Sequence, residues 1–233
     1  MTKETLNVLL TFRMPVLGTA NANPKLHLEH VASRSPDAER IQKEIEALPA
    51  EEQLEKSTTV FPQENGNPFA YDYQLRGFFK GQIATLVELD EPCAKSLSKW
   101  SYKRAVDTML FIEDWKNFFI DKDGKRIPAE AMTEHTRPMR VETQQGPRVC
   151  LATSQQIPEG TQLRFTVKWY VNGAPMTRTK KDGSEAAVSR LRINRELIIA
   201  SLDLGDDYGF SQWRGGGFGR FKWTEDKEKK STA

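Results

Sequence analysis

Cysteine, histidine and long hydrophobic runs are scarce in this sequence, and each scarcity excludes a class of protein. Only Cys93 and Cys150 occur among 233 residues, far apart and without metal-ligand spacing. We therefore expect two reduced, structural thiols in a cytosol-like compartment. No hydrophobic run approaches the roughly 20 residues that a membrane-spanning helix needs, and no signal-peptide pattern precedes the first strand. The sequence predicts a cytoplasmic protein without a membrane anchor.

A strong excess of positive charge, which marks many nucleic-acid-binding proteins, is also missing. The chain has 34 lysines and arginines against 32 aspartates and glutamates, for a net charge of +2. Any basic surface must therefore come from local clustering of positive residues. His27 and His30 lie three residues apart, but no further ligands accompany them. We expect neither a metal nor another cofactor.

What the sequence does contain is a glycine-rich segment with many aromatic residues, at positions 202–223. Glycine permits positive φ and the close approach of another chain, and consecutive exposed N–H groups can form a nest for an anion. Arg214 and Arg220 flank the glycine run, from where both could reach phosphates. The alternative interpretation is a flexible hairpin that leads into a final core strand. The glycines of this segment are Gly205, Gly209, Gly215, Gly216, Gly217 and Gly219.

The spacing within this segment excludes two nucleotide-binding motifs. No helix follows the glycines, which excludes a Rossmann fingerprint, and no Gly-Lys-Ser/Thr is present, which excludes a P-loop. Gly217–Phe221 is instead similar to the glycine–aromatic signature of RNA-recognition motifs, with Arg220 where that signature has an aromatic residue.

A predicted helix at 74–89 carries the second informative pattern. Arg76 and Lys80 are four residues apart and therefore share one face. Gly77 and Gly81 have the same spacing beside that basic edge. Because each glycine costs about 1 kcal/mol in a helix interior, the pair indicates that something approaches closely. The sequence leaves open whether this is a phosphate backbone or another strand.

A predicted β-hairpin at 137–151 carries the third pattern. Arg137, Arg140 and Arg148 lie along it, and its turn is expected near Gly146. Because the hairpin lacks an apolar face, we expect it to project from the domain. It either contacts a ligand or is simply solvated.

The order of the predicted elements indicates an α+β protein with a ferredoxin-like, RRM-like βαββαβ core. Two large insertions, at 14–70 and 121–160, interrupt a single domain that spans residues 1–225. A charged tail follows at 226–233, and we expect it to be disordered. The core elements are expected near 5–13, 74–89, 107–113, 162–170, 184–203 and 217–224.

Three of these places together resemble the RAMP superfamily of CRISPR-associated proteins, in particular the backbone subunits that polymerise along a guide RNA. The first strand ends in Met14-Pro-Val-Leu-Gly18, like the family's Pro-Leu-x-Gly turn. Tyr71–Lys80 is similar to the family's Leu-Lys-Gly-x-x-Arg segment, with Arg76 and Lys80 exchanging the basic residue types. The segment Gly209–Phe221 resembles the family's terminal glycine-rich loop and strand. The chain is also similar to RAMP-like proteins of phage and prophage genomes.

The resemblance implies sequence-independent binding of single-stranded RNA or DNA in a groove that crosses copies of a self-associating subunit, as a filament or a ring. By this resemblance, Arg76 and Lys80 hold phosphates and the glycine-rich loop packs against the nucleic-acid strand. The Arg137–Arg148 hairpin crosses over the same nucleic-acid strand. Phe79, Tyr71 or Trp213 could stack on bases if exposed. The implied nucleic-acid-binding residues are Arg76, Lys80, Arg137, Arg140, Arg148, Arg214, Gly217, Gly219 and Arg220.

Two other functions stay open at this point. The chain could be a metal-independent endoribonuclease, with His27 or His30 as the general base and Tyr71 or Tyr73 nearby. It could instead be a structural subunit or an inhibitor that mimics a CRISPR subunit, which the near-neutral charge favours. The sequence shows no further acid–base cluster that would favour an enzyme.

Overall fold

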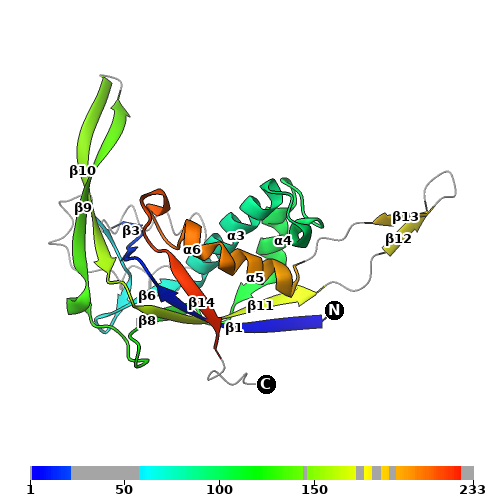
Figure 1. The fold of residues 1–233 in the computed structure, drawn as a ribbon, viewed down its shortest axis with the longest axis horizontal. Helices are drawn as coiled ribbons and strands as arrows, with labels where there is room; N and C mark the ends of the chain where they lie inside the picture. Colours follow the sequence, from blue (N-terminus) through cyan, green and yellow to red (C-terminus); the bar gives the residue numbers. More distant parts are fainter. Residues whose placement is uncertain are drawn as a thin grey trace, which may run out of the picture.

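The computed structural model describes residues 2–21, 58–143, 146–171, 176–179, 185–188 and 193–226 of the protein. The protein is a mixed α+β structure dominated by antiparallel sheet, as the sequence predicts (Figure 1). Most of the first predicted insertion, residues 22–57, and the tail beyond residue 226 lie outside the described residues. No helix in the described ranges is long and apolar enough to cross a membrane.

The central sheet is built on β1 (Thr2–Phe12), in which hydrophobic and polar residues alternate. Because side chains of a strand point alternately to its two faces, Leu6, Val8, Leu10 and Phe12 all enter the core. On its two sides β1 pairs antiparallel with β11 (Gln162–Val171) and β14 (Phe221–Glu225), and β11 also pairs antiparallel with β7 (Leu110–Ile112).

Further strands extend this sheet beyond β11. The first residues of β11 pair with β8, which pairs with β6, which pairs with β5. Both β7 and β8 therefore lie beside β11 on the side away from β1, where β8 pairs with its first residues and β7 pairs farther along it. The bounds are β5 Gln63–Glu64, β6 Asn67–Tyr71 and β8 Lys116–Ile120.

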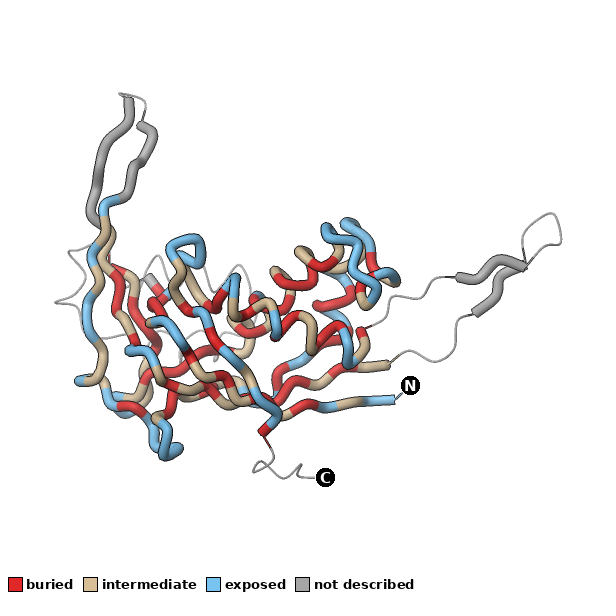
Figure 2. Tube along the Cα trace, in the orientation of Figure 1, coloured by how far each residue is buried: buried red, intermediate tan, exposed pale blue. Residues whose placement is uncertain are grey.

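The helices cover one face of the central sheet (Figure 1). The apolar side of α3 supplies buried Leu75, Phe79 and Ile83 to one large core cluster, which also contains Phe165 of β11 and Leu197 of α5. Figure 2 shows buried residues along the interior of the body. The bounds are α3 Asp72–Glu88, η2 Pro92–Ala94, α4 Tyr102–Met109, α5 Arg195–Asp203, α6 Gly205–Tyr208, and the 3-10 turns η3 Ala129–Ala131 and η4 Arg214–Gly216.

A second sheet carries the projecting hairpin. Its strand order is β2-β10-β4-β3, and β9 pairs along its whole length with β10. The β9–β10 hairpin extends away from the body (Figure 1), and its connection at 144–145 lies next to Gly146, as the sequence predicts. The bounds are β2 Val16–Leu17, β3 Ala20–Asn21, β4 Thr58–Val60, β9 Thr133–Thr143 and β10 Gly146–Ile157.

The predicted helix at 184–203 is wrong in its first half. Residues Glu185–Val188 form strand β13, which pairs antiparallel with β12 (Met176–Thr179). The helix α5 begins only at Arg195, because the Asn194 side chain caps it by accepting a hydrogen bond of 2.8 Å from the Leu197 N–H. The strand predicted at 107–113 is likewise shorter, since α4 continues to Met109 before β7 begins.

Candidate nucleic-acid interface

The glycine-rich loop, residues 209–220, joins α6 to β14 and is held tightly by its own backbone. The Phe210 N–H donates to the Gly219 carbonyl, and the Gly219 N–H donates to the Pro15 carbonyl, both at 2.8 Å. Gly219 has φ +70°, and a Cβ added there would lie 1.9 Å from the Phe210 oxygen. Gly219, which the sequence assigns to ligand binding, is therefore buried and packs against Phe210. Its lack of a side chain serves the loop itself.

The loop also contains two residues other than glycine in the left-handed region, Ser211 (φ 75°) and Trp213 (φ 50°). Such conformations cost about 1–3 kcal/mol each and occur where surrounding contacts impose them. Here the Ser211 hydroxyl donates to the Leu17 carbonyl at 2.5 Å. The Gln212 amide nitrogen lies 2.6 Å from Thr59 Oγ1 and 2.9 Å from Ser154 Oγ. These bonds attach the loop to β2, β4 and β10, and so to the base of the hairpin.

An aromatic cluster makes a second connection between loop and hairpin. Trp213 stacks on Phe218 with ring centroids 4.9 Å apart, and His135 of β9 lies 4.9 Å from Phe218. The Arg137 guanidinium carbon lies 4.4 Å from the centroid of the Trp213 ring. Arg137 is therefore positioned at the foot of the hairpin, over an aromatic ring, where the interaction is attractive.

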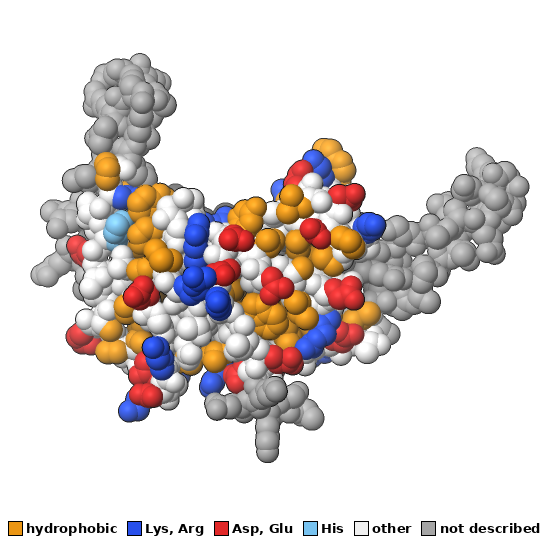
Figure 3. Space-filling view, viewed as in Figure 1, with side chains coloured by type: hydrophobic (Ala, Val, Ile, Leu, Met, Phe, Trp, Pro, Cys, Tyr) orange, Lys and Arg blue, Asp and Glu red, His pale blue; other side chains and the backbone are white. Residues whose placement is uncertain are grey.

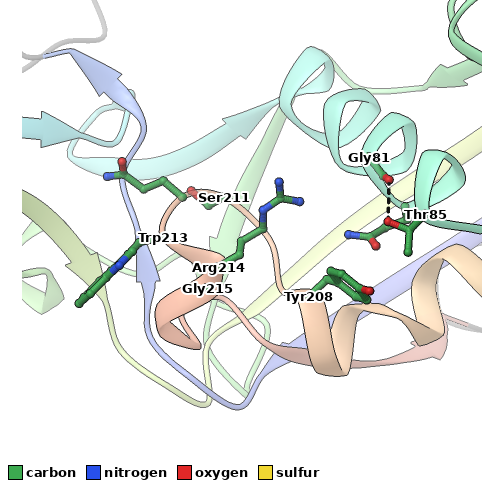
Figure 4. A pocket seen from close by; sticks show the side chains of 9 residues that line it. Gly81, Thr85, Tyr208, Ser211, Trp213, Arg214 and Gly215 are labelled. Atoms are coloured by element: carbon green, nitrogen blue, oxygen red, sulfur yellow. Dashed lines mark hydrogen bonds between the residues drawn. The ribbon is translucent and has the colours of Figure 1, made fainter. Parts of the chain in front are cut away.

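A groove of about 590 Å³ lies between this loop and α3 (Figure 4). Arg214 reaches from the loop toward α3, whereas the Trp213 ring points to the other side of the loop. Arg214 is exposed and forms no ion pair with any residue in the described ranges. The groove is lined by Gly81, Gln82, Thr85, Tyr208, Ser211, Gln212, Trp213, Arg214 and Gly215.

Gln82 contributes an unsatisfied polar group to the groove wall. Its side chain is only 1% exposed, and its Oε1 has no hydrogen-bond partner in the structure. A buried acceptor without a partner is costly, and such groups are uncommon in folded proteins. Gln82 was missed by the sequence analysis, although a polar residue between the apolar positions of α3 was a usable signal. Tyr208, also missed, carried no such signal.

Arg76 and Lys80 lie on a different edge of α3. Lys80 Nζ is 2.5 Å from Asp107 Oδ1, and Arg76 Nη2 is 3.7 Å from the same atom and donates to the Asp107 carbonyl at 3.1 Å. Both predicted phosphate contacts are therefore already paired with α4. At 3.6 residues per turn, Gly81 lies about 140° around the helix from Arg76, so Arg76 and Arg214 do not converge in one groove.

Gly77 and Gly81, which we call the glycine strip, lie between these two edges of α3. A Cβ at Gly77 would meet nothing within 4 Å, and one at Gly81 would meet only Arg214 Nη1, at 3.6 Å. No β-strand of the described chain packs over the strip. The described ranges therefore do not support the interpretation that the two glycines make room for another β-strand. The strip is a side-chain-free path across α3 from the Arg76–Lys80 edge to Arg214.

The other predicted residues are placed as follows. Arg220 is exposed, and its carbonyl accepts hydrogen bonds from the N–H groups of Arg13 (2.8 Å) and Met14 (3.3 Å). In the hairpin backbone, Arg140 pairs with Val149 and Arg148 with Val141. Gly217 has φ +85°, as a left-handed turn requires. Figure 3 shows lysine and arginine side chains gathered in the middle of the face that contains the loop.

Three aromatic residues were candidates for base stacking, and the structure separates them. Phe79 and Tyr71 are fully buried, so neither ring is available for stacking on a base. Phe79 faces the sheet because it continues the apolar stripe of α3, and Tyr71 lies in a ring cluster with Tyr73 (5.3 Å) and Trp115 (5.6 Å). Trp213 is 40% exposed, although Phe218 and Arg137 contact its ring.

The structure describes only Tyr71 and Tyr73 of the residues proposed for a nuclease. His27 and His30 lie outside the described residues, and the burial of Tyr71 removes it from any surface site. Burial raises the pKa of the Cys93 thiol, which keeps that group protonated and a poor nucleophile.

Comparison with known proteins gives structural similarities but no match in sequence. No protein-family model matches the chain, and no curated protein matches it in sequence. Among solved structures, a chain of a "Type IV-B CRISPR Complex" is similar with a TM-score of 0.40 and 8% sequence identity, over 99% of this chain and 93% of that one. This likeness is weak and assigns neither a family nor a function to the chain.

Proposed function

We propose that the protein binds single-stranded nucleic acid, with the sugar-phosphate backbone lying on the glycine strip and entering the groove between α3 and the glycine-rich loop. The observation that carries the proposal is the position of Arg214. Its guanidinium is exposed, has no acidic partner in the described chain, and lies over Gly81, where a side chain would block access. A cation beside a side-chain-free helix surface suits a phosphate backbone.

The proposal includes a ferredoxin-like core. It is supported by the antiparallel order β14-β1-β11-β7, with α3 between β1 and β7 in sequence and α5 between β11 and β14. That order places both helices on one face. The groove then forms where α3 of the core meets the loop that precedes β14.

The chemistry of the groove favours sequence-independent binding. Arg214 offers charge, and Tyr208 offers a hydroxyl group. These groups suit phosphate and sugar oxygens, which carry no sequence information. The net charge of +2 is small, so affinity has to come from this local site and will fall steeply with salt.

The experiment is fluorescence anisotropy with labelled 20-nucleotide oligo(U) and oligo(dT) over a series of salt concentrations. We expect binding of at least one strand at low salt, and a loss of affinity for Gly81→Leu, which fills the groove beside Arg214. The control is Thr133→Leu, which places leucine at an exposed position at the start of β9, outside the groove. Absence of binding to both strands at low salt, with the protein folded, would favour a structural or inhibitory protein instead.

The self-association expected from the sequence stays a prediction, and the same material tests it. Size-exclusion chromatography with light scattering, with and without nuclease and with absorbance at 260 and 280 nm, compares the mass of the protein on and off a strand. Mass that grows with oligonucleotide length is expected for copies that assemble along nucleic acid. A monomer on every length would contradict assembly and leave binding intact.

A further inference from the structure

A second aromatic and basic surface lies on the face of the central sheet that the helices leave open. Phe111 occupies the middle of β7 between the buried residues Leu110 and Ile112, and is 39% exposed. In β11 the odd-numbered residues from 163 to 169 are buried, which turns Lys168 and Tyr170 toward the opposite face. A large apolar ring exposed in mid-strand has no role in the core of the described chain.

The register of the strands places these residues side by side. Phe111 is directly opposite Lys168, and Tyr170 is directly opposite Lys3 of β1. The rings of Phe111 and Tyr170 are 5.8 Å apart and nearly perpendicular, at 79°. Together with Trp169 they surround a small hollow of about 110 Å³. We call Lys3, Phe111, Lys168 and Tyr170 the sheet patch.

The charge around the patch is positive. Lys168 pairs with Glu113, and Arg76, whose guanidinium lies 5.9 Å from the Phe111 centroid, pairs with Asp107, as does Lys80. Lys3 is exposed and forms no ion pair with any residue in the described ranges. Lys3 is therefore an uncompensated positive charge beside the rings of Phe111 and Tyr170. The complementary ligand is planar, aromatic and anionic.

Resting on the proposed function, we propose that the sheet patch is a second nucleic-acid contact, at which an unpaired nucleobase stacks on Phe111 or Tyr170 while its phosphate contacts Lys3. Stacking on aromatic side chains accepts any base, because every base has a π-face, and sheets that present aromatic residues bind single-stranded RNA in this way. The patch rests on observations independent of the groove, because the two share no lining residue.

A protein partner fits the patch less well. Stable protein interfaces bury about 800 Å² on each partner around an apolar centre. The sheet patch offers two rings separated by lysines, and the neighbouring Thr166 and Asn7 bond each other at 2.8 Å. A polar surface with two rings matches a nucleotide in size and chemistry.

Photo-cross-linking tests the proposal at single residues. The full-length protein is irradiated with 20-nucleotide strands that carry 5-iodouracil at varied positions, and the cross-linked peptides are identified by mass spectrometry. We expect cross-links at Phe111 or Tyr170. Cross-links at Tyr208 or Trp213 alone would overturn the sheet patch and leave the groove standing. Cross-links in the patch alone would support the patch and overturn the groove.

Affinity measurements give a second readout. Phe111→Leu keeps an apolar side chain but removes the ring, and we expect it to weaken oligo(U) or oligo(dT) binding about fivefold or more. Phe111→Trp is expected to restore binding. The matched control is Trp100→Ala, which removes an aromatic ring that is 94% exposed outside the patch and is expected to change nothing. Unchanged affinity in a folded Phe111→Leu variant would overturn the proposal.

Discussion

The two edges of α3 carry similar residue types but differ in what their cations can do. On one edge, Arg76 and Lys80 share the Asp107 carboxylate of α4. On the other edge, Arg214 approaches Gly81 from the glycine-rich loop without an acidic partner in the described chain. A paired cation contributes little extra attraction to a phosphate, because its charge is already compensated. The difference teaches that a candidate phosphate site is identified by a positive charge that no carboxylate compensates. A basic residue in a motif is not sufficient.

The two edges also differ in backbone strain. The α4 edge consists of ordinary helix, whereas the loop of the other edge holds Ser211 and Trp213 in the left-handed region. Hydrogen bonds from Ser211 and Gln212 to β2, β4 and β10 maintain that conformation. Strain that neighbouring contacts maintain is typical of functional sites. The loop is therefore the stronger of the two candidate surfaces, and the following predictions test that ranking.

The largest effect is expected from Gly219→Ala, which should destroy the loop that positions Arg214. Positive φ and the 1.9 Å approach of a Cβ to the Phe210 oxygen should lower the free energy of unfolding by about 2–5 kcal/mol. Urea denaturation measures the loss. Gly215→Ala is the control, because a Cβ there meets nothing within 4 Å. Equal stability of the two variants would contradict the assigned role of Gly219.

Arg214→Ala should weaken nucleic-acid binding more than Lys80→Ala. A charge-assisted hydrogen bond contributes about 1.5–3 kcal/mol, so we expect a loss of about tenfold or more for Arg214→Ala. The loss for Lys80→Ala should be smaller, because Asp107 already compensates its charge. Anisotropy titrations at several salt concentrations measure both, and the salt dependence should also become shallower for Arg214→Ala. Lys125→Ala, on an exposed turn, controls for net charge. A larger loss for Lys80→Ala would reverse the ranking.

Asp107→Asn should leave the positive charges of the α4 edge uncompensated, as the charge of Arg214 already is. The substitution frees Arg76 and Lys80, and we expect binding to tighten about two- to fivefold at low salt, an effect that screening removes at high salt. Stability should change by less than about 1 kcal/mol, because the ion pairs are exposed. Glu159→Gln, on an exposed turn, removes the same charge elsewhere. If both substitutions tighten binding equally, the effect comes from net charge and not from this edge.

Gly77→Ala should have the smallest effect and should act in opposite directions on stability and on binding. Alanine in an open helical position is expected to raise stability by about 0.5–1 kcal/mol, since nothing lies within 4 Å of the added Cβ. If a strand crosses the glycine strip, the methyl group should weaken binding about twofold. Thermal unfolding and anisotropy on the same sample separate the two effects. Tighter binding by the variant would contradict a path of the nucleic-acid strand over the glycine strip.

Much of the framework follows from local sequence patterns. Alternation in β1 and β11 and the apolar stripe of α3 identify these elements, because period and side-chain direction are linked within each element. The start of α5 was harder to predict. Ala187 and Val188 also fit a helical stripe, but cross-strand pairing with β12 draws them into β13, and such pairing involves residues distant in sequence.

Some features of the candidate site also follow from the local sequence, whereas others depend on tertiary packing. The sequence by itself determined that residues 209–220 form a glycine-rich turn before a strand and that Arg76 and Lys80 share a helix face, because both depend on neighbours within a few residues. Only the tertiary structure decided that Asp107 compensates Arg76 and Lys80, that Gln82 and Arg214 line one groove, and that Phe111 lies beside Tyr170. The physical reason is range: conformation is set locally, whereas burial and charge compensation are set by which distant elements pack together.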